Sequence, residues 1–434
     1  MSIRIMAITA VLVSMASAVM ADESICSALL SDNTPSKEQK KQIPLVTLGN
    51  AIGNAFQNDL RRRRAYSEIE AERLNKAIAS FGPPDQMEIE TENFPGSGIA
   101  DDIDRLEVTG SYARIWERGG KRQARENLAA SGITLAEATA IKTEYQIAYE
   151  VRKTYIETLM ASARKELACN QMKRLTSLKS VIEKRVKQSV DPLVAEVRFA
   201  TELLSAQSRF HQLEIEEDSF KERLSSFIGI TKDDFILDKR LLDEPVVIRP
   251  VDPSFSSTPY VVELEARQRK ARARMEVERS NRVTDITWRI GVRSYGFSND
   301  LGLVTGISIP LGMGARGDAG LARARAQESV IFTEKRAFLQ QMRREVIALQ
   351  RSIRSAGITL EALEGSLIPT AEQALELAEQ GYLEGALSFR DVLDSYEALI
   401  ALRREKLDQL EAYLLNDAAL WRLSAKQPTG ESPQ

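Results

Sequence analysis

Two aspartates near the end of the sequence have a spacing that suits chemistry. Asp391 and Asp394 are three residues apart, so both carboxylates would lie on one face of a helix. Paired carboxylates can exchange protons with a substrate or attract cations. Acid–base catalysis needs further groups, and no base, nucleophile or glycine-rich phosphate cradle accompanies this pair in the sequence. We therefore predict that the protein is not an enzyme and uses no cofactor.

The other residues with chemical potential are few. His211 is the only histidine, and the two cysteines, Cys26 and Cys169, are more than a hundred positions apart. No Cys/His cluster has the spacing of metal ligands, so we predict no metal site, and whether the cysteines pair stays open. The segment Gly119-Gly120-Lys121-Arg122 lacks the spacing of a phosphate-binding loop. It is predicted to turn a strand into a helix.

The N-terminus predicts the compartment. Arg4 precedes an apolar run, and the small residues that follow end at Ala21, which is the pattern of a secretory signal peptide over residues 1–21. Removing it leaves 58 basic and 62 acidic residues, a net charge of −4. This balance gives no indication of a nucleic-acid partner. No other segment approaches 18 consecutive apolar residues, so a crossing of the membrane would have to use strands.

Two long helices are predicted from the spacing of apolar residues. The first runs from about 121 to 187, which at 1.5 Å per residue is about 100 Å long. The second, from about 317 to 381, carries a coiled-coil seam with alternating spacings of three and four. Helices of this length cannot bury their apolar stripes within a globule. They are therefore expected to pack lengthwise on partners.

Each long helix is followed by a turn and a returning helix, at about 192–227 and about 389–424. Asp191 before Pro192 is predicted to be the N-cap of the first returning helix. Apolar residues of the two returning helices correspond at an offset of 196: Leu203, Leu224 and Phe227 match Leu399, Leu420 and Leu423. The chain is therefore interpreted as two copies of one unit.

Alternating segments precede each long helix, at about 86–116 and about 285–311, and predict two strand hairpins. Their alternation suits a membrane-facing apolar side and a polar inner side. Four strands cannot close a barrel, so strands in lipid would require several chains. The open alternative is a small soluble sheet on a periplasmic coiled-coil rod.

This order of elements resembles the TolC-like outer membrane factors over nearly all of the mature chain. Glu92-Asn93-Phe94 with residues 117–122, Glu-Arg-Gly-Gly-Lys-Arg, is similar to the pattern of the CzcC-like, heavy-metal branch. Arg118 departs from it, because an apolar residue is usual there. Ile307 to Leu311, Ile368 to Glu372 and Tyr382 to Asp394 are similar to further family signatures.

The resemblance implies a mainly α fold with a small β part. Three copies would form a homotrimer in which twelve strands close an outer-membrane β-barrel above a periplasmic α-helical barrel. It also implies a periplasmic adaptor and an inner-membrane pump as partners, outer-membrane lipid around the strands, and a passive duct that exports heavy-metal cations. The alternatives are drug efflux, type I protein secretion and, from another class, a soluble periplasmic adaptor or scaffold.

The resemblance also gives roles to named residues. Asp391 and Asp394 match the paired aspartates that narrow the periplasmic entrance, so they are expected to gate the duct and select cations; the alternative is that they favour a helix dipole. An adaptor is expected to dock at the helix tips, represented by Asp191, Pro192, Gly385 and Ser388. Four aromatic residues have two alternative interpretations, an aromatic belt at the membrane boundary or ordinary strand packing: Tyr112, Trp116, Trp288 and Tyr295.

The predicted organisation follows from these elements. The mature chain begins with an N-terminal extension, 22–43. The first repeat covers 44–230, a linker or equatorial segment covers 231–257, and the second repeat covers 258–425. A disordered tail is expected at 426–434.

Overall fold

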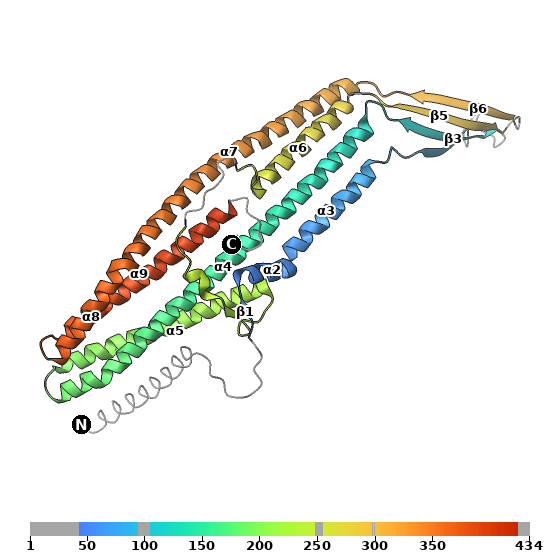
Figure 1. Ribbon diagram of the computed structural model, residues 1–434. Coiled ribbons are helices and arrows are strands. Elements are labelled where there is room, and N and C mark those ends of the chain that lie inside the picture. The colour runs from blue at the N-terminus through green and yellow to red at the C-terminus, as the bar shows by residue number, and fades with distance from the viewer. Residues whose placement is uncertain (1–42, 94–104, 248–254, 297, 299, 424–434) are drawn as a thin grey trace.

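The protein is an elongated rod of helices that ends in a small sheet (Figure 1). The computed structural model describes residues 43–93, 105–247, 255–296, 298 and 300–423. The predicted signal peptide at 1–21, residues 22–42 of the extension and the tail at 426–434 lie outside these residues. The strands are at one end of the rod and two helix turns are at the other (Figure 1).

The described elements repeat the order helix, two strands, long helix and returning helix, and the first copy begins with one additional short helix. The first copy consists of α2 (Leu48–Asn58), α3 (Leu60–Ala79), β2 (Gln86–Glu92), β3 (Glu107–Trp116), α4 (Lys121–Lys187) and α5 (Leu193–Ile228). The second consists of α6 (Pro259–Ser280), β5 (Ile286–Tyr295), β6 (Asp300–Ser308), α7 (Met313–Ala362), a π turn (Leu363–Leu367), α8 (Ile368–Leu383) and α9 (Phe389–Arg422).

A short two-stranded sheet, which the sequence did not predict, lies near the middle of the rod. β4 (Ile236–Leu237) pairs in parallel with β1 (Leu45–Val46) and is followed by a 3₁₀ turn (Lys239–Leu242). The hydroxyl of buried Tyr155 on α4 donates to the carbonyls of Val46 and Asp238, each at 3.0 Å. This small sheet therefore packs on the middle of α4.

The large apolar cores lie in the middle and at the turn end of the rod. The turn-end core joins α4 and α5 of the first copy to α8 and α9 of the second. Nearer the strands, the buried residues are mostly small, such as Ala65, Ala140 and Ala324. None of the described helices combines the length and the apolarity needed to cross a membrane.

The second long helix is not continuous, contrary to the prediction of one helix over about 317–381. α7 ends at Ala362, and a π turn carries the chain into α8, where the N–H of Ile368 donates to the carbonyl of Leu363. Pro369 follows directly. Proline lacks an N–H and its ring clashes with the carbonyl four residues earlier, so a widened turn here relieves that clash.

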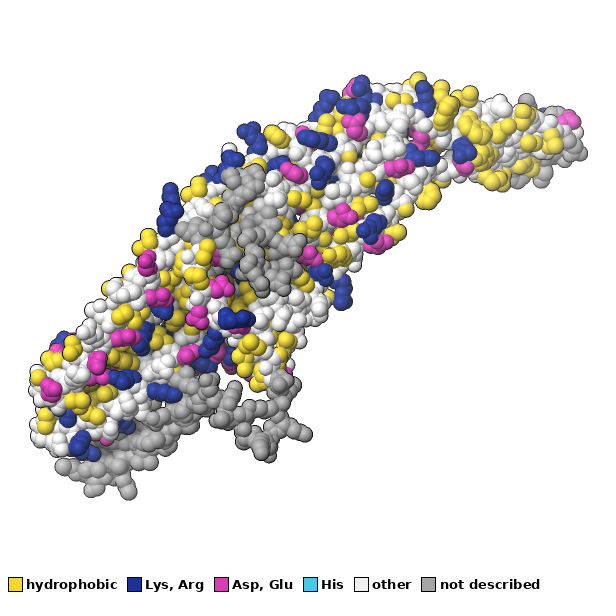
Figure 2. All heavy atoms as spheres, in the orientation of Figure 1, with side chains coloured by type: hydrophobic (Ala, Val, Ile, Leu, Met, Phe, Trp, Pro, Cys, Tyr) yellow, Lys and Arg dark blue, Asp and Glu magenta, His cyan; other side chains and the backbone are white. Residues whose placement is uncertain are grey.

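The four longer strands form one antiparallel sheet with the order β2-β3-β5-β6. One face is polar, with Arg293 bound to Glu92 at 2.8 Å and to Glu107 at 2.9 Å. The other face is apolar and exposed. Its large residues are at least 36% exposed: Met87, Ile89, Val108, Trp288, Ile290, Val292, Leu301, Leu303 and Ile307. Figure 2 shows hydrophobic side chains gathered over this end of the molecule.

Candidate functional site

The turn between α8 and α9, residues 384–388, is here called the second tip. Gly385 has φ +82°, a left-handed conformation that favours glycine. Ser388 is the N-cap of α9 and forms a capping box with Asp391, whose carboxylate accepts from the Ser388 N–H at 2.8 Å and from its hydroxyl at 2.6 Å. These bonds lower the pKa of Asp391 below its ordinary value.

Asp394 lies one turn further along α9 and is exposed. Its carboxylate is 3.6 Å from the guanidinium of Arg390. Such an exposed i,i+4 pair holds a carboxylate only weakly. Within one chain, therefore, Asp391 has a structural role at the helix start, whereas Asp394 has none that the helix requires. The prediction that the two form a gate concerns the assembled protein and stays a prediction.

The first tip, residues 188–192 between α4 and α5, differs from the sequence prediction. Asp191 was expected to cap α5, but the N-cap is Pro192 and no side chain caps this helix. The carboxylate of Asp191 instead accepts from Arg185 Nε at 2.9 Å and from the Tyr382 hydroxyl at 2.5 Å. These two stronger partners hold it away from the α5 backbone.

Arg185, Asp191 and Tyr382 form a cluster that we call the tip latch. The guanidinium of Arg185 also lies over the Tyr382 ring, 4.2 Å from its centroid. Burial alone would raise the pKa of Asp191, yet the hydrogen bonds from Tyr382 and Arg185 outweigh it and lower that pKa below 3.8. Burial and the bond to Asp191 raise the pKa of Tyr382. The latch therefore joins the two copies through a charged hydrogen bond.

The latch lies on the turn-end core. Tyr382 is 4% exposed and packs against Phe389 of α9, which in turn contacts Phe199 of α5. Cys169 belongs to the same core and is disulfide-bonded. The only other cysteine in the sequence, Cys26, lies outside the described residues.

At the opposite end of α4, the Gly-Gly-Lys segment turns the strand into the helix. Gly119 and Gly120 have φ of +70° and +71°, and a Cβ on Gly119 would lie 2.7 Å from the Val283 side chain. Lys121 is 7% exposed and its ammonium is 2.7 Å from Asp285, just before β5. The segment thus ties the first hairpin to the second through a partly buried ion pair.

The predicted aromatic residues lie on the sheet, where Tyr112 and Trp288 contact edge to face with 5.7 Å between ring centroids. Trp116, at 64% exposed, lies at the helix end of β3. The described residues contain no group of three or more His, Cys, Asp or Glu side chains placed to hold a metal ion. Sequence reasoning missed Tyr382 as a partner of Asp191 because 191 residues separate them. It missed Arg185, which is in the preceding helix, because Asp191 was assigned to the N-cap of α5.

Comparison with known proteins gives relatives in both sequence and fold. No protein-family model matches the chain. The cobalt-zinc-cadmium resistance protein CzcC of Cupriavidus metallidurans is 25% identical over 291 residues, 66% of this chain and 69% of that protein. The nickel and cobalt resistance protein CnrC of the same organism is 24% identical over 218 residues, about half of each chain.

Solved structures share nearly the whole fold. CusC superimposes with a TM-score of 0.70 at 16% identity and covers 90% of this chain and 95% of its own. The outer membrane protein VceC of Vibrio cholerae gives 0.69 at 18% identity, with 87% and 95% covered. The chain therefore has the TolC-like fold. Its sequence relatives CzcC and CnrC are named for resistance to heavy metals.

Proposed function

We propose that this TolC-like chain forms a trimeric duct through the outer membrane. The observation that carries the proposal is the sheet: β2 and β6 each have one paired neighbour among the described strands, and each leaves its other edge open. Backbone groups left open in lipid cost several kcal/mol each, at least ~2. Three copies joined from β6 to β2 supply twelve strands and leave no open edge.

The two faces of the sheet support the same assembly. Arg289 pairs with Glu88 at 3.2 Å, and Arg293 binds both Glu107 and Thr109, all on the polar face. A closed barrel with this face inward would enclose charges and water, while the exposed apolar face would meet acyl chains. The helices would then extend into the periplasm, with both tips at the far end.

We further propose that this duct serves an efflux system with a periplasmic adaptor and an inner-membrane pump. The proposed substrates are heavy-metal cations, since CzcC and CnrC are named for resistance to cobalt, zinc, cadmium and nickel. The duct itself supplies passage, and the pump supplies energy and most of the substrate choice. The tips, with Gly385 and Ser388 exposed at the second, are the proposed docking surface for the adaptor.

Fractionation tests the membrane assembly. The duct should require detergent for extraction and migrate as a trimer that dissociates on heating. Release by salt alone, as a monomer, would instead support the soluble adaptor. Deleting the gene and measuring sensitivity to zinc, cobalt, cadmium, copper and drugs tests the substrate. Sensitivity to drugs alone would remove the metal assignment.

The gate is tested by separating its two aspartates. In a trimer, Asp391 and Asp394 would each form a ring of three carboxylates at the entrance. Asp394→Asn removes one ring without touching the capping box, and the double variant with Asp391→Asn removes both. We expect cation block of single-channel current in planar bilayers to weaken in Asp394→Asn and further in the double variant. Block unchanged in both would remove these residues from the gate.

A further inference from the structure

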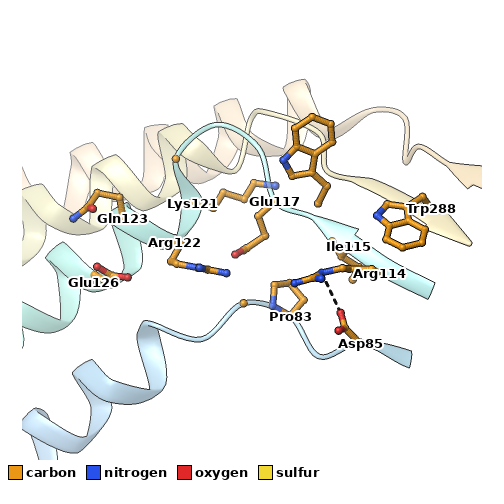
Figure 3. A pocket seen from close by; sticks show the side chains of 13 residues that line it. Pro83, Asp85, Arg114, Ile115, Glu117, Lys121, Arg122, Gln123, Glu126 and Trp288 are labelled. Atoms are coloured by element: carbon orange, nitrogen blue, oxygen red, sulfur yellow. Dashed lines mark ion pairs between the residues drawn. The ribbon is translucent and has the colours of Figure 1, made fainter. Parts of the chain in front are cut away.

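A hollow lies at the junction of the sheet and the helices. It has a volume of about 810 Å³ and is lined by residues from the α3–β2 connection, β3, the start of α4 and β5 (Figure 3). Arg114, Trp116 and Trp288 of its lining share the apolar face of the sheet with Ile290, as their register shows. The hollow therefore adjoins the exposed apolar surface.

Two arginines from different elements point toward one another across this hollow (Figure 3). Arg114, from β3, has one acidic partner, Asp85, at 3.4 Å. Arg122, from the first turn of α4, is exposed and has no ion pair with any residue that the structure describes. Two cations that line one hollow favour an anion there. A planar guanidinium also has donors left over for such an anion.

The other charges near the hollow are already engaged, with one exception. Lys121 is bound to Asp285 at 2.7 Å, and Glu117 forms a two-point pair with Arg125. Glu126 lines the hollow and has no ion pair within the described part of the chain. Arg122 and Glu126 are four residues apart on α4, so a cation and an anion lie side by side at the hollow. A ligand that carries both a phosphate and an ammonium would match this pair of charges.

Gly82 keeps room for this arrangement. A Cβ on Gly82 would lie 2.6 Å from a terminal nitrogen of Arg122. A larger side chain there would displace the guanidinium from the hollow and leave its charge intact. The backbone N–H groups at the start of α4 have no side-chain cap and add to the preference for negative charge.

We propose that this hollow binds the headgroup of a phospholipid of the inner leaflet, with the phosphate on Arg114 and Arg122 and the ammonium near Glu126. The acyl chains would extend along the apolar face of the sheet beyond Trp288. Free phosphate would satisfy the arginines alone, whereas a phospholipid also covers the adjoining apolar surface. This inference rests on the proposed membrane assembly and deepens it.

Native mass spectrometry of the detergent-solubilised protein tests the site, with palmitoyl-oleoyl phosphatidylethanolamine and, separately, inorganic phosphate as probes. We expect Arg114→Gln with Arg122→Gln to weaken lipid binding about tenfold, because each removes a charge-assisted bond to phosphate. Arg122→Gln alone breaks no ion pair and should give part of this loss. Gly82→Val should do the same while keeping the charge.

The matched control is Arg344→Gln with Arg351→Gln, two exposed arginines on α7 that have no ion pair in the described residues. These should bind lipid as the parent does. Equal lipid binding in all variants, or binding of phosphate without lipid, would overturn the proposal. Trimer dissociation and bilayer conductance measured on the same samples report separately on the duct, so a conducting trimer with unchanged lipid binding refutes the lipid site alone.

Discussion

Both copies in this chain have a long helix followed by a turn and a returning helix, but they differ in how the long helix and the turn are built. α4 is unbroken over 67 residues, and its tip is fixed by Asp191. The corresponding helix of the second copy is divided by the π turn before Pro369, and its tip is held by a glycine and a capping box. The first copy therefore provides a rigid rod, and the second provides a rod with a joint near its tip.

The largest effect is expected from adding a proline to the first rod and removing one from the second. Ser177 is exposed within α4, and Ser177→Pro should destabilise the protein by about 3 kcal/mol because a mid-helix proline removes a bond and clashes. Pro369→Ala should change stability by less than about 1 kcal/mol, because the π turn already accommodates that site. Circular dichroism melting measures both, with Ser177→Ala as the control. Equal losses would show that the second rod has no joint.

The next test separates the tips by removing the latch. Tyr382→Phe takes the hydroxyl donor from a nearly buried carboxylate and should cost about 2 kcal/mol. It should also raise bilayer conductance, because the second tip would be free to move from the first. Tyr396→Phe is the matched control, because this buried tyrosine donates to the carbonyl of Gln171, at 3.3 Å, and to no carboxylate among the described residues. Conductance that rises equally in both variants would contradict the latch.

The latch also predicts a pH dependence. The pKa of Asp191 is lower in the folded protein than its ordinary 3.8, so the carboxylate binds fewer protons folded than unfolded. Its stabilisation is therefore complete above about pH 4 and declines as the pH falls through the lower, folded value. Acid melting curves of the parent should show this loss, and Tyr382→Phe should show less of it.

A smaller effect is expected from exchanging the turn residues. Ser189 at the first tip has φ +55°, and Gly385 at the second has φ +82°. A residue with a Cβ costs about 1–2 kcal/mol in this conformation, so Gly385→Ser should destabilise and Ser189→Gly should stabilise by up to that amount. Melting temperatures that move in the same direction would show that packing, not backbone conformation, dominates the tips.

The smallest expected effect concerns the capping box. Ser388→Ala should cost about 1 kcal/mol, because it removes a side-chain cap at the start of α9. Ser189→Ala at the first tip lacks a cap to lose and serves as the control. If Ser388→Ala lowers stability but leaves cation block unchanged, the capping box stabilises α9 and has no part in the gate. A loss equal to that of Ser189→Ala would show that the box does not stabilise α9.

The sequence predicted the elements well where local patterns decide them. The helix from about 121 to 187 coincides with α4, and both hairpins and the order of the two copies follow from periodicity. What it missed depends on contacts between distant residues. Asp191 has a suitable N-cap type, but two partners from elsewhere in the fold compete for it. Asp391 was selected for its spacing from Asp394, whereas its role within the chain is to form a capping box with Ser388 at the start of α9.

The unbroken α4 has an ion pair at each end. Lys121 binds Asp285 beside the sheet, and Arg185 binds Asp191 beside the tips, close to 100 Å away along the axis at 1.5 Å per residue. A helix without a break has no place where an applied torque is absorbed. A twist applied to the strands would thus be transmitted along α4 to the tip latch. In the second copy, the π turn between α7 and α8 would take up part of that twist.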